Sequence, residues 1–294
     1  MGTGSESRGD NGVRQSSPTL SRLMLGKALR RLREAADVSR EAAGKAIRGS
    51  ESKISRLELG RTGFKLRDVA DLCTLYGVTD ATERAPLIEL AQVANSAEWW
   101  HLYRDVIPGW FEPYLGLEQA ASLIRGYAPL FIPGLLQTPD YASAVIRSGH
   151  STLKTDIERL VELRMRRQRI LYGPEPAHLW VVIGEAALRR PVGGREIMSA
   201  QLRHLLSVCD LSHLTLQVQS FRRGGYAAEG PFTILRLPDP ELPDVAYLEH
   251  LGAALYPDRP ADLDFYRHWM NLLTTQAETA DATPEILRRI LSEI

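Results

Sequence analysis

The side chains whose types and spacing suggest a specific chemistry lie on one short segment. Residues 51–59 are typical of a helix that places Ile54 and Leu57 on an apolar face. The outward positions carry four polar side chains: Glu51, Ser52, Ser55 and Arg56. An arginine can donate two hydrogen bonds to a guanine edge, and a glutamate can accept one from a cytosine amino group. We therefore expect these four residues to contact bases in the major groove of double-stranded DNA.

A second set of side chains suits the phosphate backbone, because basic and hydroxyl groups bind phosphate oxygens without distinguishing sequence. This set comprises Arg40, Ser50, Lys53 and Thr62. Residues 21–67 hold thirteen Lys or Arg against five Asp or Glu, a net charge of +8 in a chain whose total is zero. Such a split favours one nucleic-acid-facing part and one part with another task. The alternative is a helical bundle with a merely solvated basic surface.

A helix-turn-helix would hold these side chains in place. Apolar residues at helical spacing predict a first helix: Leu25, Leu29, Leu32 and Ala36. Ser39 and Ser50 suit the N-caps of a second and a third helix, and Gly60 suits the end of the third. Small residues in the second helix permit a close crossing: Ala43, Gly44 and Ala46. An apolar face then predicts a fourth helix that ends at Gly77: Leu66, Val69, Leu72, Cys73 and Tyr76.

The run from Ser39 to Gly60 resembles the XRE/lambda-repressor-like helix-turn-helix, most specifically in Ile54-Ser-Arg-Leu-Glu-x-Gly60. The resemblance implies an all-α DNA-binding domain, which we place at residues 19–79. It puts base and phosphate contacts on the two sets above and adds Arg61 to the phosphate contacts. Two positions depart from the family: Arg40 stands in place of a glutamine, and Arg48 in place of the turn glycine. Because a positive φ is costly for any residue except glycine, we expect the turn to be shifted by one residue.

Flanking segments have other roles. Residues 1–18 are polar and rich in glycine and serine, which predicts a disordered arm whose Arg8 and Arg14 could touch DNA. Residues 80–112 predict a linker helix at 81–94, followed by an aromatic seam. Its candidate ligand or partner surface comprises Trp99, Trp100, Tyr103 and Trp110. The alternative is that these rings pack a linker against a core.

Residues 113–294 predict a mixed α+β domain, so the chain as a whole is α+β. Apolar runs bounded by Gly or Pro predict strands at 179–184, 214–219, 232–237 and 245–251, in a sheet of four or five strands that is antiparallel in part. Periodicity predicts helices at 140–148, 155–172, 195–208, 261–275 and 284–294, the last capped by Thr283. The arginines between 159 and 169 fit a solvated or ion-paired face better than a second nucleic-acid surface.

Catalytic motifs are not apparent in the sequence. We find no nucleophile elbow, zinc-binding pair, phosphate loop or dinucleotide fingerprint, and the seven histidines are scattered. We therefore expect no catalytic residues, no metal site, no cofactor and no enzyme activity. Two isolated cysteines and the absence of a long apolar run favour a cytoplasmic protein that does not enter a membrane.

Several C-terminal segments resemble a large family of actinobacterial regulators, the WhiJ- and AbaA-associated type, in which a helix-turn-helix precedes a domain of unassigned biochemistry. The matching segments begin at Trp99, Pro133, Arg164, Leu188 and Gly230. The resemblance implies a transcription regulator whose C-terminal domain is a sensor that binds an effector or a small protein encoded by an adjacent gene. DNA-site geometry adds a homodimer to this expectation. The alternatives are a toxin–antitoxin-like protein that sequesters the small neighbour and an enzyme delivered to DNA.

Overall fold

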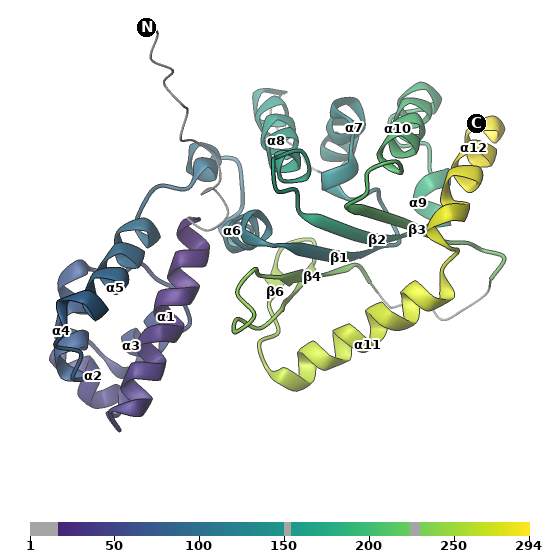
Figure 1. Cartoon of the computed structure of the whole chain (residues 1–294). Helices are drawn as coiled ribbons and strands as arrows, with labels where there is room; N and C mark the ends of the chain where they lie inside the picture. Colours follow the sequence, from purple (N-terminus) through teal and green to yellow (C-terminus); the bar gives the residue numbers. More distant parts are fainter. Residues whose placement is uncertain (1–16, 150–153, 224–229) are drawn as a thin grey trace, which may run out of the picture. The chain divides into compact units, whose positions relative to one another are not determined.

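The computed structural model describes residues 17–149, 154–223 and 230–294 (Figure 1). The chain divides into two compact units, residues 1–101 and 102–294. The arm predicted for residues 1–18 lies outside the described residues except for its last two. Those two belong to the first helix, because Pro18 is its first residue and the Ser17 hydroxyl accepts a hydrogen bond from the Leu20 N–H at 3.1 Å.

The described part of the first unit is all-α, as the sequence predicts. It contains α1 (Pro18–Ala35), α2 (Arg40–Ala46), α3 (Glu51–Glu58), α4 (Leu66–Leu75) and α5 (Ala81–Ala94). The core comes from the predicted apolar faces, with Leu25, Leu29 and Ile54 almost completely buried. Two predicted core positions differ, because Ala36 and Leu66 lie at helix ends where their side chains are exposed.

Four consecutive helices end in the same way. After each of α1 to α4, one residue takes a positive φ and two backbone N–H groups bond back to the last turn, which is a Schellman motif. Gly60 (φ 64°) and Gly77 (φ 79°) occupy this position after α3 and α4, as predicted. Asp37 and Arg48, both at φ 52°, occupy it after α1 and α2. The predicted shift of the turn is therefore wrong: Arg48 itself adopts the left-handed conformation, held by the bond from the Gly49 N–H to the Gly44 carbonyl at 2.8 Å.

Two glycines let the helices of this unit approach closely. A Cβ atom on Gly44 would lie 2.9 Å from the Ser50 carbonyl carbon, so α2 meets the start of α3 there. A Cβ on Gly26 would lie 2.5 Å from the Leu57 oxygen, so α1 meets the end of α3. Both distances are too short for a real side chain. The contact at Gly44 confirms the predicted close crossing of α2 and α3. The contact at Gly26 fixes the C-terminal end of α3 against α1.

Helix α5 has the predicted bounds but a different role from the predicted linker. It packs along α1, with Ala91 and Ala94 buried in the core of the first unit. Its C-cap residue Asn95 accepts a hydrogen bond from the Phe64 N–H at 3.0 Å and donates one to the Phe64 carbonyl. The loop that follows α3 is therefore fixed by α5. Burial of its apolar face makes α5 the fifth helix of the domain, whose boundary falls after His101.

The second unit is built on a six-stranded mixed sheet among its described residues. Its strands are β1 (Leu123–Ala128), β2 (His178–Gly184), β3 (Leu214–Gln219), β4 (Phe232–Arg236), β5 (Val245–Glu249) and β6 (Ala254–Leu255). Their order is β3-β2-β1-β4-β5-β6, in which β1, β2 and β3 are parallel and the remaining pairs are antiparallel. The α+β prediction is confirmed. The sequence analysis missed β1 and β6.

Helices cover both faces of this sheet (Figure 1). They are α6 (Glu112–Ala120), α7 (Pro139–Gly149), α8 (Lys154–Arg167), α9 (Glu185–Arg189), α10 (Arg195–Val208), α11 (Pro260–Gln276) and α12 (Thr283–Glu293). In Figure 1, α7, α8 and α10 lie on one side of the sheet and α11 on the other. The α11 side buries Tyr127, Val182 and Phe232 against Met270 and Leu273.

The predicted helices are present, and two details differ. The helix predicted at 155–172 ends at Arg167 and continues as the 3-10 helix η3 (Gln168–Leu171). Thr283 was predicted to cap α12, but it is the first residue of that helix. Its hydroxyl donates instead to the Leu216 carbonyl of β3 at 2.7 Å. The reason is tertiary: the buried Thr283 side chain ties α12 to the sheet.

Candidate DNA-binding surface

Helix α3 presents the predicted base-contacting residues in the predicted manner. Ser50 begins the helix, and its hydroxyl oxygen accepts a hydrogen bond from the Lys53 N–H at 3.2 Å. The side chains of Glu51, Ser52 and Arg56 are exposed, and Ser55 is half-buried. Because the apolar side of α3 is fixed in the core, its polar side faces solvent over the first two turns. Within the described part of the chain, no hydrogen bond or ion pair engages the Arg56 guanidinium.

Arg40 is only partly available for phosphate. Its Nε donates to Oε2 of Glu58 at 3.2 Å, while the Arg33 guanidinium donates to both oxygens of the same carboxylate. Glu58 is 7% exposed, and its bond to Arg33 raises the pKa of that arginine. The motif glutamate therefore joins α1, α2 and α3. Arg33 of α1 is itself buried, at 8% exposed.

Lys53 also has a partner inside the domain. Its Nζ lies 2.6 Å from Oδ2 of Asp68, which is 2% exposed. This ion pair joins α3 to α4 and competes with phosphate for the lysine charge. The other phosphate candidates lie closer to solvent, with Arg61 exposed and Thr62 half-buried in the loop after α3. Their DNA contacts stay predictions.

Arg48 is a surface residue that the sequence analysis did not assign to the site. It sits between α2 and α3, and its side chain is exposed. A basic side chain at that turn is well placed for a phosphate that flanks the bases under α3. The sequence places an arginine near this turn, but only the structure shows that Arg48 itself occupies the turn position.

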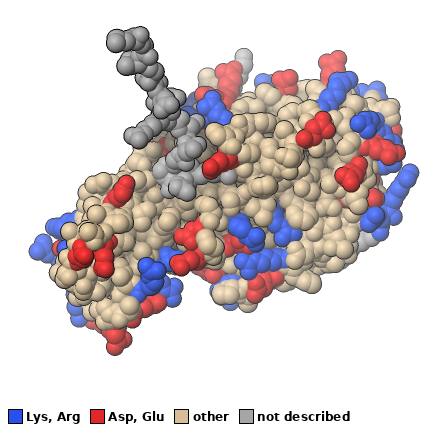
Figure 2. Space-filling model, in the orientation of Figure 1, with Lys and Arg blue, Asp and Glu red and all other residues tan. Residues whose placement is uncertain are grey.

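Charge alone does not outline the surface. Figure 2 shows Lys and Arg side chains mixed with Asp and Glu over the visible face of the molecule. The basic residues inside the first unit divide into those paired with buried carboxylates and those that face solvent. The arrangement on α3, rather than a uniform basic patch, therefore defines the candidate surface.

Comparison with known proteins agrees with this geometry. Residues 24–87 match a helix-turn-helix domain, and residues 111–289, more than half of the chain, match the family described as Domain of unknown function (DUF5753). The chain belongs to the DUF5753 family. No curated protein and no solved structure matches the chain. The helix-turn-helix domain indicates a DNA-binding regulator, and the DUF5753 domain has no assigned activity.

Two arginines of α8 pair with carboxylates of the second unit. Arg167 on α8 donates to both oxygens of Glu118 on α6, at 2.7 and 2.8 Å, and stacks on the rings of Phe111 and Tyr114. Burial opposes the charge on Arg167, but Glu118 outweighs it and raises the arginine pKa. Arg159 bonds Asp105 at the surface, at 2.8 Å. These contacts agree with the ion-paired face expected for α8.

A polar network in the DUF5753 domain brings together two segments that carried the family resemblance. Arg164 donates to the Gln137 side-chain oxygen at 2.8 Å, and Gln168 donates to the Gln137 carbonyl at 2.7 Å. From α10, Gln201 donates to the Leu136 carbonyl at 2.7 Å. Burial and the nearby charge of Arg167 lower the pKa of Arg164 to about 10, so it stays protonated at neutral pH. The segment that begins at Pro133 is thus fixed by buried amides and an arginine.

The aromatic seam divides between the two units. Trp100 is 2% exposed and Tyr103 is 4% exposed, and a binding role for them stays a prediction. Trp99 and Trp110 are half-buried, and a binding role for them stays a prediction. The rings of Trp99 and Trp100 meet edge to face at 5.6 Å, and the Tyr256 hydroxyl donates to the Trp110 carbonyl. These contacts support the packing alternative for much of the seam.

None of the described helices combines the length and the apolar character needed to cross a bilayer. Among the residues that the structure places, no three His, Cys, Asp or Glu side chains gather as metal ligands would. Cys73 is buried and Cys209 is half-buried, and burial raises the pKa of both thiols.

Proposed function

We propose that the protein is a sequence-specific DNA-binding transcription regulator in which α3 enters the major groove. The observation that carries this proposal is the pairing of a buried apolar face on α3 with exposed Glu51 and Ser52 at its start and exposed Arg56 in its last turn. A recognition helix contacts base edges with its N-terminal residues while its inner face packs. Ser55 completes the base-contacting set. The helix-turn-helix is proposed to be of the XRE type.

The phosphate-contacting set surrounds this helix. It comprises Arg40, Ser50, Lys53, Arg61 and Thr62, together with Arg48 at the turn. Ser50 uses its oxygen as an acceptor in the cap, so its hydroxyl hydrogen is able to bond a phosphate. Such contacts fix the register of the protein on DNA, and α3 supplies the sequence preference.

The regulator is proposed to act as a homodimer on two half-sites. A single small domain buries little DNA surface, and tight specific binding requires a second one about one helical turn away. The DUF5753 domain is proposed to bind an effector or a small protein encoded next to this gene, as in the actinobacterial WhiJ- and AbaA-associated regulators. No enzyme activity is assigned to it, and the setting is the cytoplasm. A toxin–antitoxin-like role, in which the chain sequesters that small protein, is the second candidate.

The test is selection of binding sites by the full-length protein from a pool of random DNA duplexes. The proposal predicts enrichment of one short sequence, repeated at a spacing of ~10 base pairs if the protein dimerises. Affinity for the selected duplex should fall steeply with salt and exceed that for a scrambled duplex at every salt concentration. Equal affinity for both duplexes would contradict the proposal. Sedimentation of the complex with one and with two half-sites tests the dimer separately.

A further inference from the structure

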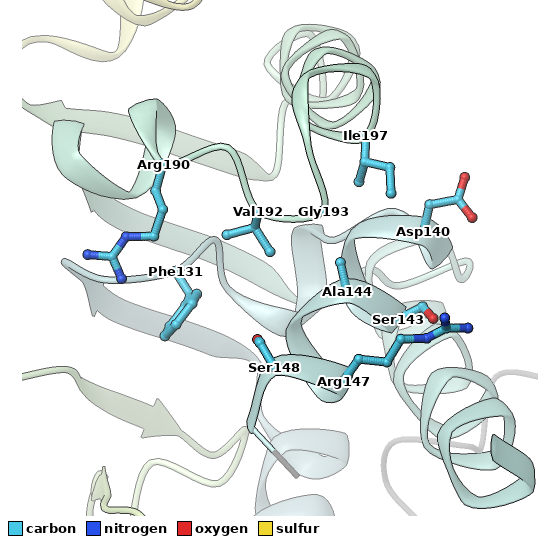
Figure 3. A pocket seen from close by; sticks show the side chains of 10 residues that line it. All are labelled: Phe131, Asp140, Ser143, Ala144, Arg147, Ser148, Arg190, Val192, Gly193 and Ile197. Atoms are coloured by element: carbon cyan, nitrogen blue, oxygen red, sulfur yellow. The ribbon is translucent and has the colours of Figure 1, made fainter. Parts of the chain in front are cut away.

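A groove in the DUF5753 domain has features of a ligand site that the proposed function does not use. It has a volume of about 880 Å³ and lies between α7 and the loop that connects α9 to α10. Four apolar side chains line it, Phe131, Ala144, Val192 and Ile197, together with polar ones that include the Asp140 carboxylate and two arginines (Figure 3). Small-molecule sites range from ~300 to 1,000 Å³ and are lined largely by apolar side chains. The volume of the groove falls within this range.

Two arginines flank this apolar lining. Figure 3 shows Arg190 beside Phe131 on one side of the groove and Arg147 of α7 on the other, with Val192 and Ala144 between them. The Arg190 guanidinium carbon lies 5.6 Å from the centre of the Phe131 ring, within the range of a cation–π contact. Over the described ranges, neither arginine forms an ion pair with a carboxylate. This separates them from Arg159 and Arg167, which do.

The loop that connects α9 to α10, which carries Arg190, is fixed by its backbone conformation and by close packing. Gly193 and Gly194 adopt φ values of 75° and 96°, which side-chain-bearing residues rarely tolerate. A Cβ atom on Gly193 would lie 2.8 Å from the Ala144 Cβ, so the loop packs directly onto α7. The Val192 and Gly194 N–H groups bond to Arg190 and Pro191 carbonyls within the loop. The two walls are thus held together at the base of the groove by backbone conformation and close packing.

The start of α10 also lies at the groove, and its first turn carries the Glu196 carboxylate. Gly194 occupies the N-cap position, so no side chain caps the helix, and Ile197 in its first turn lines the groove. The N-terminus of a helix favours a negative charge nearby. By itself this feature would carry little weight. Here it lies beside two arginines and an apolar lining.

We propose that this groove binds a small amphipathic organic anion, with an apolar body against Phe131, Val192 and Ala144 and an acidic group held by Arg190 or Arg147. A protein partner fits less well, because a specific protein interface takes ~800 Å² from each partner and the groove is confined to three short segments. The role of this anion as the effector rests on the proposed function. Its binding does not, since the groove lies entirely in the DUF5753 domain.

The test uses two fluorescent probes with nearly the same aromatic body. One is 8-anilinonaphthalene-1-sulfonate, which carries a sulfonate, and the other is uncharged N-phenyl-1-naphthylamine. The full-length protein should bind the sulfonate at one saturable site, more tightly than the neutral probe. Arg190→Gln and Arg147→Gln should each weaken sulfonate binding by up to about fivefold, which is the effect of a partly exposed ion pair of ~1 kcal/mol. The neutral probe should bind both variants as it binds the wild type.

Two further variants complete the design. Arg203→Gln removes an exposed arginine of α10 that does not line the groove, and it should leave both probes unaffected. Ala144→Trp fills the groove and should abolish binding of both probes, with circular dichroism confirming the fold. Sulfonate binding that is absent, or that survives Ala144→Trp and both groove arginine substitutions, would overturn the proposal. Displacement of the sulfonate only by an acidic peptide, and not by small aryl carboxylates, would also overturn it.

The titration contains no DNA, so its outcome is independent of the DNA-binding test. A protein that selects a DNA sequence but does not bind the sulfonate in the groove contradicts only this inference. A protein that binds the sulfonate in the groove but selects no DNA sequence contradicts only the proposed function.

Discussion

Two arginine-rich regions of this molecule use the same side chain in opposite ways. In the DUF5753 domain, Arg159 and Arg167 of α8 bond carboxylates of the same unit, and the second of these pairs is buried. In the helix-turn-helix domain, Arg33 and Arg40 are held by Glu58, whereas Arg48 and Arg56 project into solvent. Both regions look alike as stretches of basic sequence. The difference lies in whether the fold supplies a carboxylate.

This comparison shows why basic composition is a weak guide to a binding surface. A buried arginine with a carboxylate partner organises its domain, because separating the pair leaves an uncompensated charge. An exposed arginine without such a partner has its hydrogen-bond donors available to a ligand. The same distinction separates Arg147 and Arg190 in the groove from the arginines of α8. Substitutions at each kind of arginine, or at its carboxylate, should therefore have different consequences.

The largest effect is expected where a buried pair is broken. Glu118→Ala leaves Arg167 buried without its carboxylate and should lower the free energy of unfolding of the DUF5753 domain by about 3–5 kcal/mol. Chemical denaturation of the full-length protein, followed by circular dichroism, measures it. Asp105→Ala is the matched control, since it breaks the exposed pair with Arg159 and should have a much smaller effect. Equal losses in the two variants would contradict the distinction between buried and exposed arginines.

A second buried carboxylate should be nearly as important in the first unit. Glu58→Ala removes the partner of both Arg33 and Arg40 and should destabilise the helix-turn-helix domain by about 3 kcal/mol. Hydrogen exchange of α1 to α3 in the full-length chain localises the loss. Glu41→Ala, which breaks only the exposed pair with Lys45, provides the comparison and should leave exchange almost unchanged. If Glu58→Ala also left it unchanged, the network would not organise the domain.

A smaller effect is expected for an arginine divided between the fold and DNA. Arg40→Ala should weaken binding to all DNA sequences alike, by about 1 kcal/mol, and reduce the salt slope by about one. Because Arg40 also bonds Glu58, a modest loss of stability should accompany it. Titration of a selected and a scrambled duplex across a salt series measures the loss of affinity and the change in salt slope. A loss confined to the selected duplex would show that Arg40 contributes to sequence preference.

The smallest effect concerns the turn between α2 and α3. Arg48→Gly should raise the free energy of unfolding by about 0.5–1 kcal/mol, because glycine adopts φ 52° without the Cβ penalty. Thermal unfolding measures the change. Gly49→Ala sharpens the comparison, since Gly49 is not in the left-handed region and a Cβ there would lie 2.8 Å from Lys53 Cδ, part of a flexible side chain, with Ile47 in ordinary contact. If Gly49→Ala lowered the free energy of unfolding by more than Arg48→Gly raised it, the backbone strain would lie at Gly49 and not at Arg48.

Local signals made the first unit predictable. Ser39, Ser50, Gly60 and Gly77 define helix ends through short-range capping chemistry, and their roles are confirmed. Strand β1 escaped prediction because Gly126 interrupts its apolar pattern and its pairing partners lie far along the chain.

Partners distant in sequence account for the other differences. The carboxylates that engage Lys53 and Arg40 are 15 and 18 residues away, so no local pattern reveals them. The groove in the DUF5753 domain combines Phe131 with α7 and the loop before α10, segments whose proximity only the fold establishes.

The central claim is that α3 contacts bases through Arg56, and one measurement tests it most directly. Site selection from random DNA with wild-type protein and with Arg56→Ala compares base preference at every position. The account predicts that Arg56→Ala costs about 1–3 kcal/mol on the wild-type site and relaxes the preference at a single base pair, leaving the others intact. An unchanged preference at every position, with unchanged affinity, would contradict it and show that α3 is not the recognition helix.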